Sequence, residues 1–409
     1  MSELTDSTEL TIDEQVARLS RGVQLIVPEN GLRAKLEKSR KTGKPLIVKL
    51  GLDPTAPDIH LGFAVVLRKL RQFQDLGHTV VIIIGDYTAL IGDPSGRSAT
   101  RPMLSEEEIR QNGATYVDQL ASILDRERTI VRFNSEWLGK LSFADLVRLT
   151  SRMTVAQVLT REDFARRFEA KQPISLHELL YPLAQAYDSV AIEADVEMGG
   201  QDQTFNILAG RDLQESVGQD QQIGVFMPLL VGLDGQKKMS KSLGNYIGIR
   251  ETPLDQYSKV MSLGDDLMRE YFLLCTDVPE NEFSAMIAGA GNPMEVKHRL
   301  AGEIVKIYHG PEAAEQAGAE WRRIHSKGEF PADAPEVTVS ENPIGIVALI
   351  RQCGFAPSNG EARRLVEQGG VSVNGEKVAD PTAQVAVTDG AEFKVGKRNF
   401  ARLRTAGQP

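Results

Sequence analysis

The stretch LIVKLGLDPTAPDIHLGFAVVLRKLRQFQDLGHTVVIIIGDYT, Leu46 to Thr88, decides the fold. Its first seven residues form an apolar run that ends in a Gly/Asp/Pro turn, which predicts a strand over 46–52. Apolar residues then recur with helical spacing from Val65 to Phe73. The run TVVIIIG is a second apolar strand, of the kind found in sheets buried on both faces. Strand, helix and strand in this order predict a right-handed parallel βαβ unit.

The flanking sequence extends this unit into a larger sheet. Residues 12–45 look helical and charged, a helical stretch is expected over about 104–170, and further strands are expected around 190–233. The chain is therefore predicted to be an α/β protein with a Rossmann-like, doubly wound parallel sheet. Ligands of such sheets bind at the carboxyl ends of the strands.

The remaining sequence predicts two further domains. From about 246 to 326 the pattern is mostly helical. The segment 327–342 is rich in proline and acidic residues and is predicted to be a linker. Residues 343–409 form a compact α+β pattern. We therefore expect a catalytic domain over 1–245 with a helical insertion at about 104–190, then an α-helical domain, a linker and a small C-terminal domain.

Composition limits the class of protein. The chain has 409 residues, of which 41% are hydrophobic and 25% charged, as in globular proteins. Its two cysteines, Cys275 and Cys353, lie far apart and match no metal-ligand spacing, which is typical of a reducing compartment. The acidic N-terminus is no secretory signal, and the longest aliphatic run is too short to span a membrane. These features predict a cytoplasmic protein.

Charge is distributed unevenly along the chain. The net charge is −9. From Asn342 to Pro409, however, nine Lys/Arg residues outnumber six Asp/Glu residues, whereas the remainder has 38 against 50. A small basic C-terminal module, in a chain that is otherwise acidic, predicts that this module binds a polyanion. A chance fluctuation of a few charges is the alternative.

Two segments have the chemistry of a phosphate site. GLDPTAPDIHLG, Gly51 to Gly62, lies between a strand and a helix, whose N-terminal amides and dipole suit phosphate. His60 stands just before this helix and can donate to a phosphate oxygen. KKMSKSLGN, Lys237 to Asn245, is a cationic loop after a buried strand, and lysine can serve as a movable charge for a polyphosphate. Each segment alone is also compatible with an ordinary surface loop.

Two other segments have the chemistry of an amino-acid and ribose site. In SLHELLYPLAQAYDSV, Ser175 and Glu178 have capping-box spacing. Tyr181, Gln185 and Asp188 share one helix face, so a phenol, an amide and a carboxylate point the same way. An exposed polar face is the alternative. In MGGQDQ a strand ends in two glycines that admit a ribose, and a carboxylate follows that can accept its hydroxyl groups.

Together, the two phosphate segments resemble the HIGH and KMSKS signatures of class I aminoacyl-tRNA synthetases. KMSKS is present unaltered as residues 238–242, and the first signature reads His60-Leu61-Gly62-Phe63. With the helix of Tyr181, Gln185 and Asp188, nearly the whole chain resembles the bacterial tyrosyl-tRNA synthetases. The resemblance implies a tyrosine–tRNA ligase, whose substrates are L-tyrosine, ATP with Mg²⁺ and tRNA(Tyr), with no tightly bound metal.

The resemblance also implies roles for particular residues. Asp188 would take the phenolic hydroxyl of tyrosine, and Gln203 would approach its carboxylate. The α-amino group would be held by Tyr181, Gln185 and Asp93. The nucleotide would be lined by Gly51, Asp53, Gly62, Gly200, Asp202, Leu230 and Val231, with Asp202 at the ribose. The leaving pyrophosphate would be surrounded by Thr55, His60, Arg97, Arg101, Lys238 and Lys241.

This set of residues suits adenylate formation. The tyrosine carboxylate is already ionised when it attacks the α-phosphorus, so no general base is needed, and catalysis consists of positioning and charge stabilisation. Phenylalanine would leave Asp188 buried without its partner, so the site should reject it; tyrosyl-tRNA synthetases are the standard illustration of this effect. No editing domain is therefore expected.

Two residues depart from the family pattern. Lys49 stands where the best-known branch has a second tyrosine that touches the substrate hydroxyl, so either another residue shares that task or Asp188 acts alone. Phe63 replaces the second histidine of HIGH, and its side chain cannot donate to phosphate. The sequence therefore predicts an active site that is handicapped or locally compensated.

The segment SNGEARRLVEQGGVSVNGEKV, Ser358 to Val378, resembles the S4 RNA-binding domain. The resemblance implies tRNA contacts, and the phosphate contacts of basic residues should make binding salt-dependent. The candidate tRNA-binding residues are Arg363, Arg364, Lys394, Lys397 and Arg398, extended by Arg402 and Arg404. A solvated basic surface is the alternative.

Three rival functions stay open at this point. A tryptophanyl-tRNA synthetase shares the fold but not the Asp188 helix face. A small-molecule nucleotidylyltransferase uses a similar histidine turn but needs no RNA-binding module. A catalytically silent RNA-binding protein is favoured only by Phe63. The family resemblance also implies a homodimer built on helices in the 120–190 region.

Overall fold

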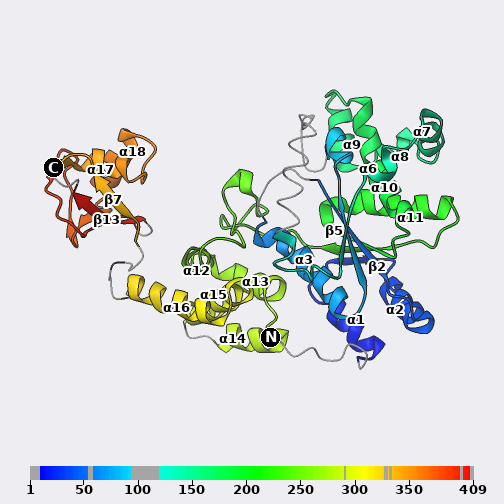
Figure 1. Cartoon of the computed structure of the whole chain (residues 1–409), viewed down its shortest axis with the longest axis horizontal. Coiled ribbons are helices and arrows are strands. Elements are labelled where there is room, and N and C mark those ends of the chain that lie inside the picture. The colour runs from blue at the N-terminus through cyan, green and yellow to red at the C-terminus, as the bar shows by residue number, and fades with distance from the viewer. Residues whose placement is uncertain are drawn as a thin grey trace. The chain divides into compact units, whose positions relative to one another are not determined.

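The computed structural model describes residues 10–53, 59–93, 119–289, 292–326, 330, 334–396 and 399–405 (Figure 1). The chain divides into two compact units, Met1–Ala314 and Glu315–Pro409. The finer domain boundaries expected at residues 245, 326 and 342 stay predictions.

The first unit is built on a six-stranded sheet in the order β1-β6-β5-β2-β3-β4. All neighbouring strands are parallel except β1, which is antiparallel to β6. The predicted fold class is therefore confirmed. The strands are β1 (Leu25–Val27), β2 (Ile47–Leu52), β3 (Thr79–Ile84), β4 (Thr129–Phe133), β5 (Val196–Gly200) and β6 (Ile223–Met227).

The chain winds outward from the middle of this sheet in two directions. From β2 it passes through α3 (Leu61–Asp75) to β3 on one side, and from β5 through α11 (Thr204–Ser216) to β6 on the other. Right-handed crossovers in opposite directions place their helices on opposite faces, and α3 and α11 lie on opposite sides of the sheet in Figure 1. The strand order reverses between β2 and β5, where a crevice opens at the carboxyl ends.

Several further helices belong to this unit. Apart from α3 and α11, they are α1 (Ile12–Ser20), α2 (Gly31–Thr42), α4 (Thr88–Ile91), α6 (Ser135–Leu138), α7 (Phe143–Thr150), α8 (Val155–Val158), α9 (Glu162–Glu169) and α10 (Tyr181–Ala191). Short 3-10 turns are η1 (Leu176–Leu180), η2 (Gln201–Gln203) and η3 (Lys241–Leu243). The capping box of Ser175 and Glu178 is confirmed at the start of η1.

The sequence-based elements were wrong in three places in this unit. Strand β1 lies within the stretch 12–45 that was expected to be helical, and strand β4 lies within the helical stretch 104–170. Strand β5 begins only at Val196, because the apolar residues around Val190 complete α10 instead. Short edge strands between helices carry too few residues to show an alternating pattern, so helical neighbours dominated the reading.

The region after the sheet is helical, as predicted. Its elements are α12 (Pro253–Met261), η4 (Asp265–Leu267), α13 (Met268–Cys275), α14 (Glu280–Gly289), α15 (Pro293–His309) and α16 (Pro311–Ser326). Helices α12 and α15 pack against each other through a buried hydrogen bond, 2.8 Å long, between Tyr257 Oη and His298 Nδ1.

The second unit has a five-stranded sheet in the order β10-β9-β12-β13-β7. Its strands are β7 (Glu336–Val339), β9 (Val371–Val373), β10 (Glu376–Lys377), β12 (Ala391–Val395) and β13 (Asn399–Thr405), and β8 (Ile344–Gly345) pairs separately with β11 (Gln384–Val385). Helices α17 (Ile346–Gln352) and α18 (Asn359–Glu367) share one core with the inward side chains of β12 and β13.

The predicted linker is wrong for its last part. Residues 336–339 form β7, which pairs in parallel with β13 and closes the edge of the five-stranded sheet. Proline and acidic residues dominated the composition there and hid the alternation of EVTV, whose Val339 is buried. Residues 327–329 and 331–333 lie outside the described residues.

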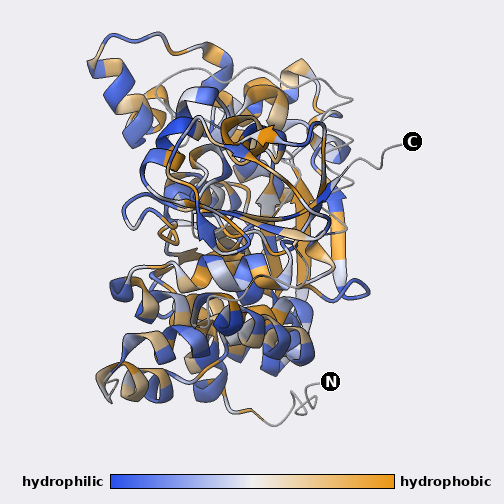
Figure 2. Ribbon diagram, turned by 90° about the vertical axis from the view of Figure 1, so that its left-hand side faces the viewer, coloured by the Kyte–Doolittle hydropathy of each residue, from blue (hydrophilic) through white to orange (hydrophobic). Residues whose placement is uncertain are grey.

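Most helices carry hydrophilic and hydrophobic residues side by side in Figure 2, as amphipathic helices around a core do. Among the helices of the described ranges, none is both long and apolar enough to cross a membrane.

Candidate active site

A cavity of about 580 Å³ opens at the carboxyl ends of β2 and β5, where the strand order reverses. It brings together most of the predicted site residues, namely Gly51, Asp53, His60, Gly62, Asp93, Tyr181, Gln185, Gly200, Asp202, Gln203, Leu230, Lys238 and Lys241. Asp188 and Val231 do not line it. Thr55, Arg97 and Arg101 lie outside the described residues.

Helix α10 presents the predicted tyrosine-binding face to this cavity. Pro182 stands in its first turn, where proline is tolerated, so the helix starts afresh at Tyr181 after η1. The Tyr181 hydroxyl donates to Asp53 Oδ2 over 2.9 Å. Burial, reinforced by the charges of Asp53 and Asp93, raises the pKa of Tyr181 well above its usual value. Tyr181 therefore stays a neutral phenol fixed by Asp53.

Asp188 lies on the same helix but beneath the cavity wall, and it is only 3% exposed. Its Oδ1 accepts a 2.8 Å hydrogen bond from the Trp137 indole, and its Oδ2 a 3.4 Å bond from the Asn134 amide. Burial raises the pKa of Asp188 to about 7, against the charge of Lys49 and these two hydrogen bonds, which lower it. Near neutral pH this carboxyl can therefore exchange a proton.

Asn134 and Trp137 were missed by the sequence reasoning. They follow the carboxyl end of β4, the place where a parallel sheet collects its functional side chains. Because a helix was expected over this stretch, no functional residues were expected at the end of a strand there. The signal was the polar tetrapeptide NSEW directly after the alternating run TIVRF.

Asp93 is held by two residues. Its Oδ1 accepts from Arg161 at 3.2 Å, and its Oδ2 accepts from Gln203 Nε2 at 3.0 Å. Arg161 is 5% exposed and also binds Asp163 and Asn206. The amide of Gln203 is thus engaged with Asp93 rather than turned to a substrate carboxylate. No sequence motif had indicated Arg161.

The imidazole of His60 lies on the opposite side of the cavity. Burial, reinforced by the charge of Lys241, lowers its pKa to about 4. Its Nδ1 is buried and has no hydrogen-bond partner among the described residues. At neutral pH His60 is therefore an uncharged imidazole, which can offer a phosphate one N–H and no positive charge.

The N-terminus of α3 differs from the expectation of free amides. Leu61 N–H donates to Ile247 O at 2.9 Å, Gly62 N–H to Met239 Sδ at 3.3 Å, and Phe63 N–H to His60 O at 3.0 Å. The expectation that these amides are available to phosphate is wrong, because the KMSKS loop accepts from Gly62, the residues after the loop accept from Leu61, and the first turn of the helix itself accepts from Phe63. Thioether sulfur is a weak acceptor, so the Gly62 contact is the weakest of the three.

The KMSKS loop, residues 238–242, is docked against this helix. Met239 is 5% exposed and its N–H donates to Leu230 O at 2.7 Å. Asn245 holds the loop through its side-chain oxygen, which accepts from Ser240 N–H at 2.8 Å. Lys238 Nζ lies 3.4 Å from Asp202 Oδ2, so a lysine of the loop faces the predicted ribose carboxylate across the cavity.

The two departures from the family pattern have different positions. Phe63 lines the cavity beside His60 and Gly62, so its side chain can meet a ligand. Lys49 is fully buried and does not reach the cavity, because its ammonium turns under α10. Lys49 therefore cannot replace the missing tyrosine by direct contact.

The candidate tRNA-binding residues of the second unit lie on two faces. Arg363 and Arg364 are exposed on α18, which covers the inner face of the five-stranded sheet. Lys394 alternates with the buried Phe393 and Val395 of β12 and so points to the opposite face. Arg402 opposes Glu392 across the β12–β13 pair on that same open face. Lys397 and Arg398 lie outside the described residues.

Comparisons with known proteins agree with this geometry. The family model described as tRNA synthetases class I (W and Y) matches residues 41–326, and that of the Tyrosine--tRNA ligase SYY-like C-terminal domain matches residues 327–401. The chain is 55% identical to the tyrosine–tRNA ligase of Moorella thermoacetica over 402 residues, covering 96% of this chain and 97% of the relative. It is 51% identical to that of Salinibacter ruber, with 96% and 97% covered.

Solved structures show the same fold. A C-terminally truncated mitochondrial tyrosyl-tRNA synthetase of Aspergillus nidulans superposes with a TM-score of 0.63 at 22% identity, over 79% of this chain and 96% of that one. The Archaeoglobus fulgidus tyrosyl-tRNA synthetase, solved with L-tyrosine, gives 0.60 at 22% identity, over 76% and 100%. The sequence relatives favour tyrosine over the rival reading as a tryptophan enzyme. The chain belongs to the class I tRNA synthetases (W and Y), and within them it is a tyrosine–tRNA ligase.

Proposed function

We propose that the cavity between β2 and β5 binds tyrosine and ATP together and forms tyrosyl-adenylate, which is then transferred to the 3′-terminal adenosine of tRNA(Tyr). One observation carries this proposal. The polar face of α10, with Tyr181 and Gln185, lines the same 580 Å³ cavity as the neutral imidazole of His60 and the ammonium groups of Lys238 and Lys241. Such a cavity holds two reactants in one enclosure, which is how positioning lowers a barrier.

On the tyrosine side, Asp188, which lies beneath the cavity wall, receives the phenolic hydroxyl. Trp137 and Asn134 already donate to its two oxygens, so the carboxylate is held in a fixed direction. The α-amino group is bound by Tyr181, Gln185 and Asp93. Tyr181 commits its proton to Asp53 and can therefore accept from an ammonium. In this docked arrangement Gln203 supports Asp93, and it reaches the substrate carboxylate only when tyrosine displaces that contact.

On the nucleotide side, the base and ribose lie along Gly51, Asp53, Gly62, Gly200 and Leu230, with Asp202 at the ribose hydroxyls. Val231 supports this wall from behind, since its carbonyl accepts from the Tyr271 hydroxyl at 2.6 Å. Lys238 and Lys241 stabilise the pyrophosphate as it leaves, and His60 adds a neutral donor. Thr55, Arg97 and Arg101 complete the proposal from the sequence. ATP enters as its Mg²⁺ complex, which supplies charge neutralisation of the phosphates.

The test is tyrosine-dependent exchange of pyrophosphate into ATP, with tryptophan in place of tyrosine as the control. We expect exchange with tyrosine only. Lys238→Ala and Lys241→Ala should each lower the exchange rate by on the order of a hundredfold with little change in the KM for tyrosine, because they act on transition-state charge. Exchange with tryptophan alone would contradict the assignment, and exchange with neither would favour the silent RNA-binding reading.

The second unit supplies tRNA affinity in this proposal. Its match to the SYY-like C-terminal domain and the exposed Arg363 and Arg364 support a contact with the tRNA backbone. Lys394 and Arg402 on the opposite face add a second basic surface, and Lys397 and Arg398 complete the set from the sequence. Binding measured at increasing salt should weaken linearly on logarithmic axes. Arg363→Ala with Arg364→Ala should reduce that slope, whereas a slope equal to that of the unaltered enzyme would rule out phosphate contacts there.

A homodimer is the oligomeric state that we propose. Large apolar side chains are exposed in the region expected to carry the interface: Ile130, Phe133, Phe143, Val147, Val155, Phe168 and Leu176. Exposed apolar surface, where it is contiguous, marks protein–protein interfaces. Light scattering at micromolar concentration should report twice the chain mass, and Phe143→Asp should shift it towards the monomer. A monomer in the unaltered enzyme would contradict this proposal. The two distant cysteines support a cytoplasmic location.

A further inference from the structure

A completely buried ion pair lies beneath the cavity. Lys49 on β2 and Glu197 on β5 are directly opposed residues of neighbouring parallel strands. Lys49 Nζ and Glu197 Oε1 are 3.0 Å apart, and the two side chains are 0% and 1% exposed. The pair occupies the switch point of the sheet, on the face covered by α10.

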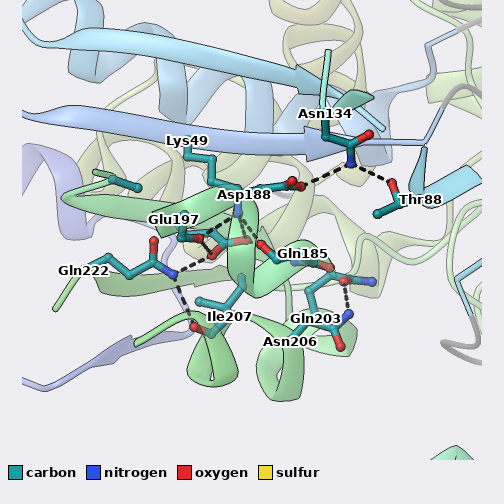
Figure 3. Close-up of polar contacts among 12 residues, drawn as sticks. Lys49, Thr88, Asn134, Gln185, Asp188, Glu197, Gln203, Asn206, Ile207 and Gln222 are labelled. Carbon is teal, nitrogen blue, oxygen red and sulfur yellow. Dashed lines mark hydrogen bonds and ion pairs between the residues drawn. The ribbon is translucent and has the colours of Figure 1, made fainter. Parts of the chain in front are cut away.

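The pair is connected to α10 by a closed set of hydrogen bonds (Figure 3). Lys49 Nζ donates to Gln185 O at 3.0 Å and to Ser189 Oγ at 2.7 Å. Glu197 Oε1 accepts from Gln185 Nε2 at 3.0 Å, and Glu197 Oε2 accepts from Ser189 Oγ at 2.9 Å and from Gln222 Nε2 at 2.5 Å. Gly210 of α11 leaves room for this set, since a Cβ there would lie 2.7 Å from Gln222 Nε2.

The first consequence concerns the amide of Gln185. Because its Nε2 donates to Glu197, its oxygen points away from that carboxylate, towards the cavity that Gln185 lines. An amide oxygen accepts hydrogen bonds from an ammonium, whereas the NH₂ group would repel it. Glu197 therefore sets Gln185 in the orientation that an α-amino group needs.

The second consequence concerns Asp188, one turn further along α10. Lys49 favours the charged form of Asp188, and Glu197 opposes it, each through the electric field inside a buried region. The other groups that face Asp188 are the indole of Trp137 and the amide of Asn134, both neutral donors. Among these neighbours, Lys49 and Glu197 are therefore the charged groups whose opposing effects set the pKa of Asp188.

A purely structural role is the alternative, because a buried ion pair often contributes little to stability and can be replaced by apolar residues. The chain contains a matched example of such a residue. Lys69 on α3 is 3% exposed, and its Nζ donates to Arg18 O, Arg21 O and Gln72 Oε1. It contacts none of the predicted tyrosine-binding residues. Lys49, in contrast, contacts Gln185 directly and acts on Asp188.

We propose that Lys49 and Glu197 are a positioning pair for tyrosine recognition, which holds the Gln185 amide in its accepting orientation and keeps Asp188 ready to accept a hydrogen bond from the phenolic hydroxyl. This inference rests on the proposed function, since it deepens the role of the same site. It also accounts for the lysine at the position where a second tyrosine was expected, because Lys49 serves the substrate hydroxyl through Asp188 rather than by contact.

The test uses the pH dependence of kcat/KM for tyrosine in pyrophosphate exchange, which reports ionisations of the free enzyme. Lys49→Met removes the charge that favours ionised Asp188. The acid limb of the pH profile, where kcat/KM falls as the pH drops, should therefore move to higher pH by on the order of one pH unit. The KM for tyrosine at neutral pH should then rise about tenfold. Glu197→Gln should move the limb to lower pH. The double variant should return it close to that of the unaltered enzyme.

Controls separate this inference from simpler explanations. The KM for ATP should stay within about twofold in all three variants, and preference for tyrosine over phenylalanine should fall in Lys49→Met. Lys69→Met should alter thermal stability without moving the limb. The proposed positioning role would be overturned by either of two results. One is an acid limb that stays in place in both single variants, and the other is a parallel rise of the KM values for tyrosine and ATP. If Lys49→Met does not fold, Glu197→Gln and the double variant decide by the same criterion. An unaltered enzyme without tyrosine-dependent exchange would instead refute the proposed function.

Discussion

At the scale of single residues, Phe63 is the clearest departure from its family. It stands in the first turn of α3 and lines the cavity next to His60 and Gly62. Its ring adds apolar surface to a wall that also contains Val66 and Met239, where a hydrogen-bond donor was expected. In the proposed function, the described residues that bind the phosphates are then His60, Lys238 and Lys241.

Phe63→His should speed up adenylate formation. If the missing histidine normally donates in the transition state, its restoration should raise the exchange kcat by on the order of tenfold to a hundredfold. Phe63→Leu is the matched control, since it keeps the apolar wall and adds no donor, and it should give no gain. Pyrophosphate exchange at saturating tyrosine measures both. A histidine variant with an equal or lower rate would mean that another group already supplies this donor.

His60 makes a prediction about acid stability. Its pKa is lowered to about 4 in the folded protein, mainly by burial, from a usual value of 6.5. Between these values the unfolded chain binds the proton that the folded protein refuses, so the free energy of unfolding falls as pH drops through this window. His60→Asn should lose less stability on acidification from pH 7 to 4.5, by on the order of 1–2 kcal/mol. Denaturant unfolding at the two pH values measures it, and equal losses would contradict the burial argument.

At the scale of elements, two segments meet at the start of α3. The KMSKS loop inserts Met239 against Gly62, and the helix amides are occupied by the loop and by the residues after it. A Cβ at Gly62 would lie 3.2 Å from the His60 ring and 3.3 Å from Met239 Cβ. Glycine is needed here for a close approach of side chains, with no positive backbone dihedral involved.

Gly62→Ala should therefore impair catalysis more than folding. Alanine favours the helix by up to about 1 kcal/mol over glycine, which offsets part of the crowding. The displaced His60 ring and loop should lower the exchange kcat by about tenfold or more, since catalytic groups tolerate little displacement. Thermal unfolding and exchange measured on one preparation test this. A large loss of stability with unchanged kcat per folded enzyme would contradict it.

At the scale of the whole molecule, the chain consists of two units with separate cores. Among the described residues, the sheet of the first unit and its cavity involve residues before 315, and the core of the second unit draws on residues from Val337 onward. The two proposed activities, adenylate formation and tRNA binding, are therefore located in different units. Such a division predicts that they can be lost separately.

A chain shortened to residues 1–326, which keeps α16 whole, should retain pyrophosphate exchange within about twofold. Its kcat/KM for tRNA should fall by on the order of a hundredfold at physiological salt, because the basic residues of the second unit are absent. Exchange and aminoacylation assayed side by side measure this. Equal loss of both activities would show that the units do not work separately.

Much of this molecule could be predicted from local pattern. The βαβ unit of 46–88 was confirmed because its apolar strands and amphipathic helix are long enough to show their periods. The same holds for the shared face of Tyr181, Gln185 and Asp188. The strands β1, β4 and β7 were not predicted, since an alternation over three to five residues at a sheet edge is too short to outweigh the pattern of the neighbouring segments. Because β4 was not predicted, Asn134 and Trp137 were missed as well, since their role depends on the strand end before them.

The sequence by itself determined the fold class, the reaction and most residues of the cavity, because motif spacing and helical periodicity are local properties of the chain. The tertiary structure alone decided the partners of those residues. That Lys49 opposes Glu197 across two strands 148 residues apart in the chain follows from the register of β2 and β5. That His60 is neutral and Asp188 titrates near pH 7 follows from burial. Contacts and desolvation depend on what the folded chain brings around a group, and no local pattern records them.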